Sequence, residues 1–224
     1  MAIMDGSVEI THGGERLQLL PQRAVYWPAQ RALIVADVHL GKGTAFRAMG
    51  LPVPSGSSAK DLQRLTALLA ATAATRLIIL GDLIHGHQSH QPALATALMA
   101  WRREQDLLDV LLVRGNHDRR AGRLSDDLRI VEVEEPHALG GLVLQHDPAA
   151  FDHGCPALAG HVHPVIAVRD FDRSRVALPC FVFDASGIGV LPSFGSFTGG
   201  ARVERAIDRQ CYVCTGTRVV RLGG

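Results

Sequence analysis

Short apolar runs recur along the chain, and each is closed by glycine, proline or polar residues. The runs at 8–10, 17–20 and 24–27 predict short strands near the N-terminus. Three further runs, at 32–36, 77–80 and 110–113, contain no polar residue, which favours strands buried in the interior. We expect these three to be the most buried strands of the fold.

Amphipathic stretches lie between the buried strands. Leu62, Leu65 and Leu69 recur at helical spacing, and Ser58 with Asp61 three residues later matches a capping pattern at a helix start. A second helix is predicted over 92–105. From residue 130 onward the pattern changes to strands and ends in a hairpin about 215–217, so the sequence predicts an α/β fold.

The chain has 224 residues, of which 47% are hydrophobic, and these values suit one domain, residues 1–224, with a large core. A formal charge of +1 argues against nucleic-acid binding by bulk electrostatics, so any phosphate must be bound by a local patch. The first residues lack the features of a signal peptide, and no stretch has the length of a membrane span. We therefore expect a cytoplasmic protein with no membrane partner. Four cysteines are too few for a disulfide framework.

Polar residues with ligand chemistry follow each of the three buried strands. Asp37 and His39 come after the first, Asp82 after the second, and Asn116 and His117 after the third. Sheets of α/β proteins place ligand sites at the carboxyl ends of their strands. If residues 37–39 are extended, Asp37 and His39 point to the same side and can hold one metal ion.

Histidine is the outlier in the composition, with 11 residues. His146, His161 and His163 follow two predicted strands of the second half, and the last two share a face if that segment is extended. One such histidine is more often structural than a ligand. Three of them, added to two carboxylates and an asparagine, are hard to explain structurally. Mixed imidazole and oxygen donors fit Mn, Fe or Zn better than Mg or Ca.

Basic residues surround the third strand end, at Arg114, Arg119, Arg120 and Arg123. Arginine suits phosphate because its planar guanidinium can donate two parallel hydrogen bonds. Phosphate binding and a solvated loop are equally compatible with these residues, and the same alternatives apply to Lys42 and Arg47. On its own, the segment 115–118 is equally typical of a polar turn.

In chain order the motifs are D-x-H at 37–39, G-D at 81–82, G-N-H-D at 115–118, a single histidine at 146 and G-H-x-H at 160–163. This series resembles the calcineurin-like metallophosphoesterase superfamily over residues 37–163. The resemblance implies a four-layer α-β-β-α sandwich, in which helices flank two mixed sheets. It also implies a centre of two divalent transition-metal ions at the strand ends, with Mn expected and Fe or Zn as alternatives.

Carried over motif by motif, the resemblance assigns a role to each of these residues. The first metal ion would be bound by Asp37, His39, Asp82 and His163. Asp82 would bridge to the second ion, which would be completed by Asn116, His146 and His161. His117 resembles the catalytic histidine that contacts the phosphate and assists the leaving oxygen.

One position departs from the family pattern. Many members carry G-D-x-x-D, whose last aspartate orients the catalytic histidine, whereas this chain has His85 at that place. Either His85 or another carboxylate, with Asp118 as the candidate, would orient His117.

A narrower resemblance, to the bacterial DNA-ligase-associated phosphoesterase group (PdeM), extends over nearly the whole chain. It is carried by residues 26–28, 37–42, 50–54, 113–120, 178–181 and 192–200. It implies that the substrate is a phosphodiester, namely DNA, and that the protein is an endonuclease of DNA repair. It also implies a functional association with an ATP-dependent DNA ligase, a helicase and an exonuclease-like protein.

Two other functions are compatible with the same residues. The dimetal centre would also suit a small-nucleotide phosphodiesterase or a phosphomonoesterase. A catalytically weak partner-binding scaffold is the alternative from another class. The presence of His117 and all seven presumed ligands argues against the scaffold, because a scaffold does not need them.

Overall fold

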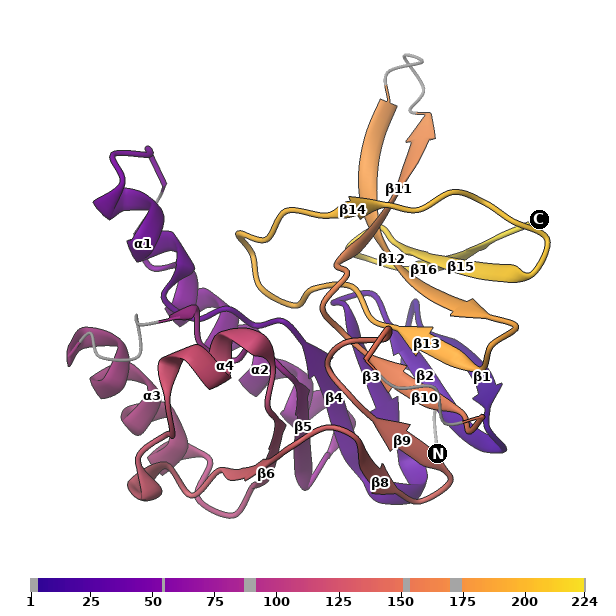
Figure 1. Ribbon diagram of the computed structural model, residues 1–224. Coiled ribbons are helices and arrows are strands. Elements are labelled where there is room, and N and C mark those ends of the chain that lie inside the picture. Colours follow the sequence, from indigo (N-terminus) through magenta and orange to yellow (C-terminus); the bar gives the residue numbers. More distant parts are fainter. Residues whose placement is uncertain (1–3, 54, 87–91, 151–153, 170–174, 224) are drawn as a thin grey trace.

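The computed structural model describes residues 4–53, 55–86, 92–150, 154–169 and 175–223, which form two β-sheets and associated α-helices (Figure 1). From their place in the sequence, His87 and His90 are predicted to lie at the surface of a loop, and both residues fall outside the described ranges. Within the described ranges, no helix is long and apolar enough to cross a membrane.

The first sheet has seven strands that follow one another in chain order. Neighbours from β1 to β4 are antiparallel, whereas neighbours from β4 to β7 are parallel. Because parallel strands end at the same edge, β4, β5 and β6 deliver their following loops to one place. The strands are β1 (Val8–His12), β2 (Glu15–Leu20), β3 (Ala24–Trp27), β4 (Ala32–Ala36), β5 (Arg76–Leu80), β6 (Asp109–Val113) and β7 (Val131–Val133).

The second sheet has nine strands, paired in the order β14-β11-β12-β13-β10-β9-β8, with β15 attached to β12 and β16 to β15. It is also mixed, since β9, β10 and β13 are parallel while β12 is antiparallel to β11, β13 and β15. The predicted C-terminal hairpin is confirmed as β15–β16. The strands are β8 (His137–Leu139), β9 (Leu142–Leu144), β10 (Ala157–Ala159), β11 (Pro164–Arg169), β12 (Arg175–Asp184), β13 (Ile188–Val190), β14 (Ala201–Arg202), β15 (Arg209–Cys214) and β16 (Val219–Leu222).

The helices are α1 (Lys42–Ala48), α2 (Ser57–Thr72), α3 (Pro92–Glu104) and α4 (Asn116–Ala121), with short 3₁₀ helices at Pro28–Gln30 and Asp126–Leu128. The predicted fold class, two mixed sheets flanked by helices, is confirmed. α2 and α3 match the predicted helices. α1 and α4 were not predicted, because they are short and lack the apolar spacing of a core helix.

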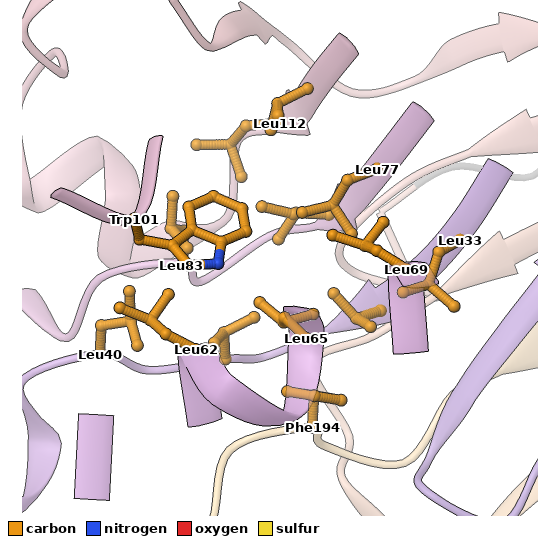
Figure 2. Close-up of a cluster of buried hydrophobic side chains, with 14 of the residues drawn as sticks. Leu33, Leu40, Leu62, Leu65, Leu69, Leu77, Leu83, Trp101, Leu112 and Phe194 are labelled. Carbon is orange, nitrogen blue, oxygen red and sulfur yellow. The ribbon is translucent and has the colours of Figure 1, made fainter. Parts of the chain in front are cut away.

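Two apolar layers hold these elements together. One lies between the first sheet and the helices, where the leucines of α2 share a cluster with Leu77 of β5 and Trp101 of α3 (Figure 2). The other lies between the two sheets and includes Trp27 of β3 and Phe181 of β12. A fully buried large apolar side chain contributes about 1.5–3 kcal/mol. The strands that lead to the polar residues are therefore held in place by packed apolar side chains.

The predicted capping of α2 by Ser58 and Asp61 is wrong. The helix follows Gly56, whose φ is 81°, and no side chain caps its start. The hydroxyl oxygen of Ser58 instead accepts a hydrogen bond from the Gly41 N–H at 3.0 Å. Asp61 accepts hydrogen bonds from the hydroxyl and the N–H of Ser196, at 2.5 and 3.2 Å. Both residues thus tie α2 to loops beside the strand ends.

Leu65→Ala is expected to lower the free energy of unfolding by about 2–5 kcal/mol, because it leaves a cavity in the core. Leu65 is only 1% exposed. The matched control is Gln63→Ala on the exposed side of α2, which should change the value by less than about 0.5 kcal/mol. Chemical denaturation followed by circular dichroism measures both, and equal losses would contradict this packing of α2.

Candidate metal centre

The loops that follow β4 and β5 lie side by side, as the two strands do, and are hydrogen-bonded to each other. The N–H of His39 in the first loop donates to the carbonyl of Asp82 in the second at 2.8 Å. The second sheet meets this edge where the N–H of His161 donates to the carboxylate of Asp37 at 2.9 Å. Hydrogen bonds therefore join loops from both sheets at one edge, and the bond between the sheets is accepted by the Asp37 side chain.

Five of the predicted ligands have a left-handed backbone, which residues other than glycine rarely adopt. The φ angles are 54° at Asp37, 51° at His39, 53° at Asp82, 68° at His161 and 51° at His163. Residues 37–39 and 161–163 are therefore not extended, and the expected strand-like alternation there is wrong. Such conformations cost about 1–3 kcal/mol each and cluster at functional sites.

Asp37, His39 and His163 form a first group, with ligand atoms all within 4.8 Å of one another. The Nε2 atoms of His39 and His163 are 3.4 Å apart, and Asp37 Oδ1 lies 3.2 Å from His163 Nε2. Asp37 Oδ1 is buried and makes no hydrogen bond within the described part of the chain. The carbonyl of Gly199 accepts from His163 Nδ1 at 3.2 Å, which leaves Nε2 available as a ligand.

Asp82, His146 and His161 form a second group within 4.8 Å. His146 Nε2 lies 3.0 Å from His161 Nδ1 and 3.1 Å from Asn116 Oδ1. The carbonyl of Leu80 accepts from His146 Nδ1 at 3.1 Å. Because Nδ1 then carries the proton, Nε2 of His146 presents its lone pair to the group.

Asp82, a member of the second group, also lies close to His39 of the first group. Its Oδ2 atom is 3.8 Å from His39 Nε2 and 3.6 Å from His146 Nε2. Its Oδ1 atom accepts a hydrogen bond from the His117 N–H at 2.9 Å. Burial raises the pKa of Asp82, and positive charge beside it would oppose that shift. This is the position expected of a carboxylate that bridges two cations.

Most distances between these donors fit the coordination of one ion, while the 3.6 and 3.8 Å distances from Asp82 are longer. Imidazole and carboxylate ligands lie about 2.0–2.2 Å from a transition-metal ion, so two ligands of one ion are roughly 3–3.5 Å apart. The imidazole nitrogens of His146 and His161 are 3.0 Å apart, which fits this range. Burial lowers the pKa of His39 to about 2, so its ring is neutral and can act as a ligand.

Glycine precedes a ligand in three of the motifs, and the structure shows a steric reason that the sequence interpretation missed. An added Cβ would lie 2.1 Å from His146 Nδ1 at Gly81, 2.3 Å from Asp82 Oδ1 at Gly115, and 2.7 Å from Asp37 Oδ2 at Gly160. Each glycine therefore leaves room for a ligand from another loop. The recurrence of glycine before these residues was the available signal.

Asp118 connects two of the loops. Its carboxylate accepts backbone hydrogen bonds from Asp82 at 2.7 Å, Gly115 at 3.0 Å and Ile84 at 3.2 Å. Burial raises the pKa of Asp118 to about 6. These contacts support the backbone on both sides of His117, and an orienting role toward the His117 ring stays a prediction.

His85 packs against the ring of His117. The two ring centroids are 4.7 Å apart and the planes differ by 25°, which is a stacked pair. His85 Nδ1 is buried and has no hydrogen-bond partner among the residues described. Burial lowers the pKa of His85 to about 4, and burial also lowers the pKa of His117. Stacking, rather than a hydrogen bond, is therefore the contact that His85 makes with His117.

Two of the predicted phosphate-binding arginines lie among glutamates. Arg114 is 3.2 Å from Glu132 and 3.1 Å from Glu134. Arg119 is 3.1 Å from Glu134 and 2.8 Å from Glu135. A phosphate would have to compete with these carboxylates, and binding by either arginine stays a prediction.

Two other basic residues act on His117. The charges of Arg120 and Lys42 both lower the pKa of His117, after the larger effect of burial. Arg120 is exposed on α4, and Lys42 begins α1. Arg47, further along α1, donates to the hydroxyl of Thr44 at 2.8 Å. Arg120 and Lys42 thus both contribute positive charge in the neighbourhood of His117.

Two buried carboxylates and several imidazoles, gathered where loops of two mixed sheets meet, are typical of a metal-dependent hydrolase. Comparison with known proteins identifies the family within this class of hydrolases. The model of the calcineurin-like phosphoesterase family matches residues 30–192. The crystal structure of Pseudomonas putida nuclease MPE has a TM-score of 0.84 and 42% identity, covering 96% of this chain and 100% of that chain. YfcE, a phosphoesterase from E. coli, has a TM-score of 0.42 and 16% identity, covering 85% and 97%, which is too distant to support an inference. A search of curated protein sequences finds no match.

The chain belongs to the calcineurin-like phosphoesterase family, as its five motifs predicted. It is a metal-dependent phosphoester hydrolase. The similarity to nuclease MPE is consistent with the ligase-associated nuclease group.

Gly115→Ala is expected to reduce the bound metal several-fold, because the new methyl group would press on the carboxylate of Asp82. Overpacking of this kind also destabilises a fold by about 1–3 kcal/mol. Gly199→Ala is the control, since an added Cβ there meets no atom within 4 Å. Elemental analysis of the purified variants measures the metal, and an unchanged content in Gly115→Ala would contradict the steric argument.

Proposed function

We propose that the protein hydrolyses phosphodiester bonds at a centre of two divalent metal ions and that its substrate is DNA. The observation that carries the proposal is the position of Asp82 Oδ2 between the nitrogens of His39 and His146. A carboxylate in this position can be shared by two ions, the arrangement used in two-metal phosphoester hydrolysis. Similarity to a solved nuclease over 96% of the chain supports a polynucleotide substrate.

The proposed ligands divide into two sets that share Asp82. One ion would be held by Asp37, His39, Asp82 and His163, and the other by Asp82, Asn116, His146 and His161. The mixed nitrogen and oxygen donors favour Mn, with Fe or Zn as alternatives. When bound, the ions would supply the positive charge that stabilises the transferring phosphoryl group and activates water.

His117 is the proposed catalytic residue. Its ring centroid lies 5.1 Å from that of His39 and 4.7 Å from that of His85, which fixes its place beside the ligands. Because burial lowers the pKa of His117, the ring is largely neutral before substrate arrives. An adjacent phosphate anion would favour the protonated ring. His117 can then donate its proton to the leaving oxygen.

Lys42 and Arg120 are proposed to bind the phosphate beside His117, because both cations already act on that ring. Their charge would balance the anionic diester while His117 transfers its proton. Phosphate contacts by Arg47 and Arg114 would require these side chains to leave the groups that they contact in the structure.

The cellular role is proposed from the narrower sequence resemblance. It comprises DNA repair in the cytoplasm and functional association with an ATP-dependent DNA ligase, a helicase and an exonuclease-like protein. The metal centre does not by itself distinguish one phosphoester from another.

His117→Ala is expected to lower kcat by about 10²–10⁴-fold, the usual contribution of a general acid. Metal content should stay unchanged, because His117 lies outside the proposed ligand sets. His137→Ala, on β8, is the matched histidine control and should retain full activity. Full activity in His117→Ala would show that the catalytic role is wrong.

The wild-type protein should bind close to two Mn ions per chain and cleave internal bonds of DNA. The assay compares single-stranded DNA, duplex DNA, a small phosphodiester and a phosphomonoester at saturating Mn. His117→Ala, purified in parallel, reports any contaminating nuclease. Hydrolysis of the monoester alone would contradict the nuclease proposal, and fewer than two ions per chain would contradict the dinuclear centre.

A further inference from the structure

Glu135 is a buried carboxylate at the junction of the two sheets. It follows β7 of the first sheet and precedes β8 of the second, and its side chain is 5% exposed. Its Oε2 atom accepts backbone hydrogen bonds from His146 at 2.7 Å and from Asp147 at 3.0 Å. Its Oε1 atom accepts a hydrogen bond from Arg119 Nη2 at 2.8 Å. One side chain thus holds the His146 loop with one oxygen and helix α4 with the other.

Arg119 lies three residues after Asn116 on α4. Its guanidinium donates to Glu134 through Nε at 3.1 Å as well as to Glu135. Arginine holds two carboxylates well because its donors form a rigid planar fork. The guanidinium is therefore directed at the segment that joins the two sheets.

Asn116 follows β6 of the first sheet and His146 follows β9 of the second, yet Asn116 Oδ1 and His146 Nε2 are only 3.1 Å apart. Their separation depends on how α4 is held against the strand end that follows β9. Two hydrogen bonds accepted by Glu135, one from Arg119 and one from the His146 N–H, connect α4 directly to that strand end. A small shift there would change the distance between the two donor atoms.

We infer that Arg119 and Glu135 are positioning residues that set the distance between Asn116 and His146, and that Arg119 is not a phosphate ligand. The inference rests on the proposed function, because it takes Asn116 and His146 as ligands of one ion. A buried carboxylate needs a charged partner, so loss of Arg119 would let Glu135 shift toward solvent and release the His146 loop. Groups that hold metal ligands in this way typically change metal affinity by about 10–100-fold.

Calorimetric titration of the metal-free protein with Mn tests the inference. Arg119→Ala should weaken one of the two Mn sites by about 10-fold or more and leave the other unchanged. Arg119→Ala should therefore lose activity at low Mn concentration and regain it at high Mn concentration. The neighbouring variant Arg120→Ala is the matched control. It should keep both Mn affinities and raise the KM for DNA.

Hydrogen exchange of the metal-free protein gives a readout without any ion. The amides of His146 and Asp147 should exchange faster in Arg119→Ala than in the wild type, and at the wild-type rate in Arg120→Ala. Glu135→Gln removes the charge of Glu135 while keeping its shape, and should weaken the same Mn site. The double variant, Arg119→Ala with Glu135→Gln, should bind Mn at this site no more weakly than the single variant with the lower Mn affinity. The two effects should not add, because both residues act through one path.

Two results would overturn the inference. The first is a raised KM in Arg119→Ala with unchanged Mn affinities and unchanged amide exchange, which would make Arg119 a substrate contact. The second is an equal loss at both Mn sites together with a lower Tm, which would make the pair a general stabilising contact. Fewer than two Mn ions in the wild type would instead contradict the proposed function, while amide exchange would still decide whether Arg119 holds the His146 loop.

Discussion

The centre depends on one buried carboxylate, Asp82, which stands where the loops of the first sheet meet the histidines of the second. Removing an ionised carboxylate from water costs several kcal/mol unless opposite charge or hydrogen bonds replace the solvent. The protein provides a hydrogen bond from the His117 N–H and fixes the Asp82 backbone through Asp118. Imidazole nitrogens lie around it, and a bound cation would compensate the carboxylate further. The rest of the site is arranged around this requirement.

Rigid packing allows the unusual backbone of the ligand loops to persist. The left-handed backbone of the five proposed ligands costs roughly 5–15 kcal/mol in total, an amount comparable with the whole net stability of a domain. Apolar layers on both faces of the first sheet hold β4, β5 and β6 in place. Hydrogen bonds between neighbouring loops then leave few alternative conformations. Glycines 81, 115 and 160 complete the arrangement by admitting ligand side chains where a Cβ would collide.

Neighbouring arginines on α4 have different partners although they are adjacent in sequence. Arg119 faces Glu134 and Glu135, while Arg120 is exposed and acts on His117. The local sequence around the G-N-H-D motif does not reveal that Arg119 and Arg120 have different partners. The acidic residues that separate them lie some fifteen positions later, beside β7, and come into contact only because β7 pairs with β6. The charge near the centre is thus divided between structural pairs and groups that can meet a phosphate.

The sequence by itself determined the buried strands, the two long helices and the family, and it gave the order in which the proposed ligands occur along the chain. These properties are local: apolar runs specify buried strands, and a side chain carries its ligand chemistry wherever the fold places it. Tertiary structure decided the left-handed loops at Asp37 and His161, the use of Ser58 and Asp61 outside any helix cap, and the partners of each arginine. Each of these depends on contacts between residues far apart in the chain, whose geometry exists only once both sheets are packed together.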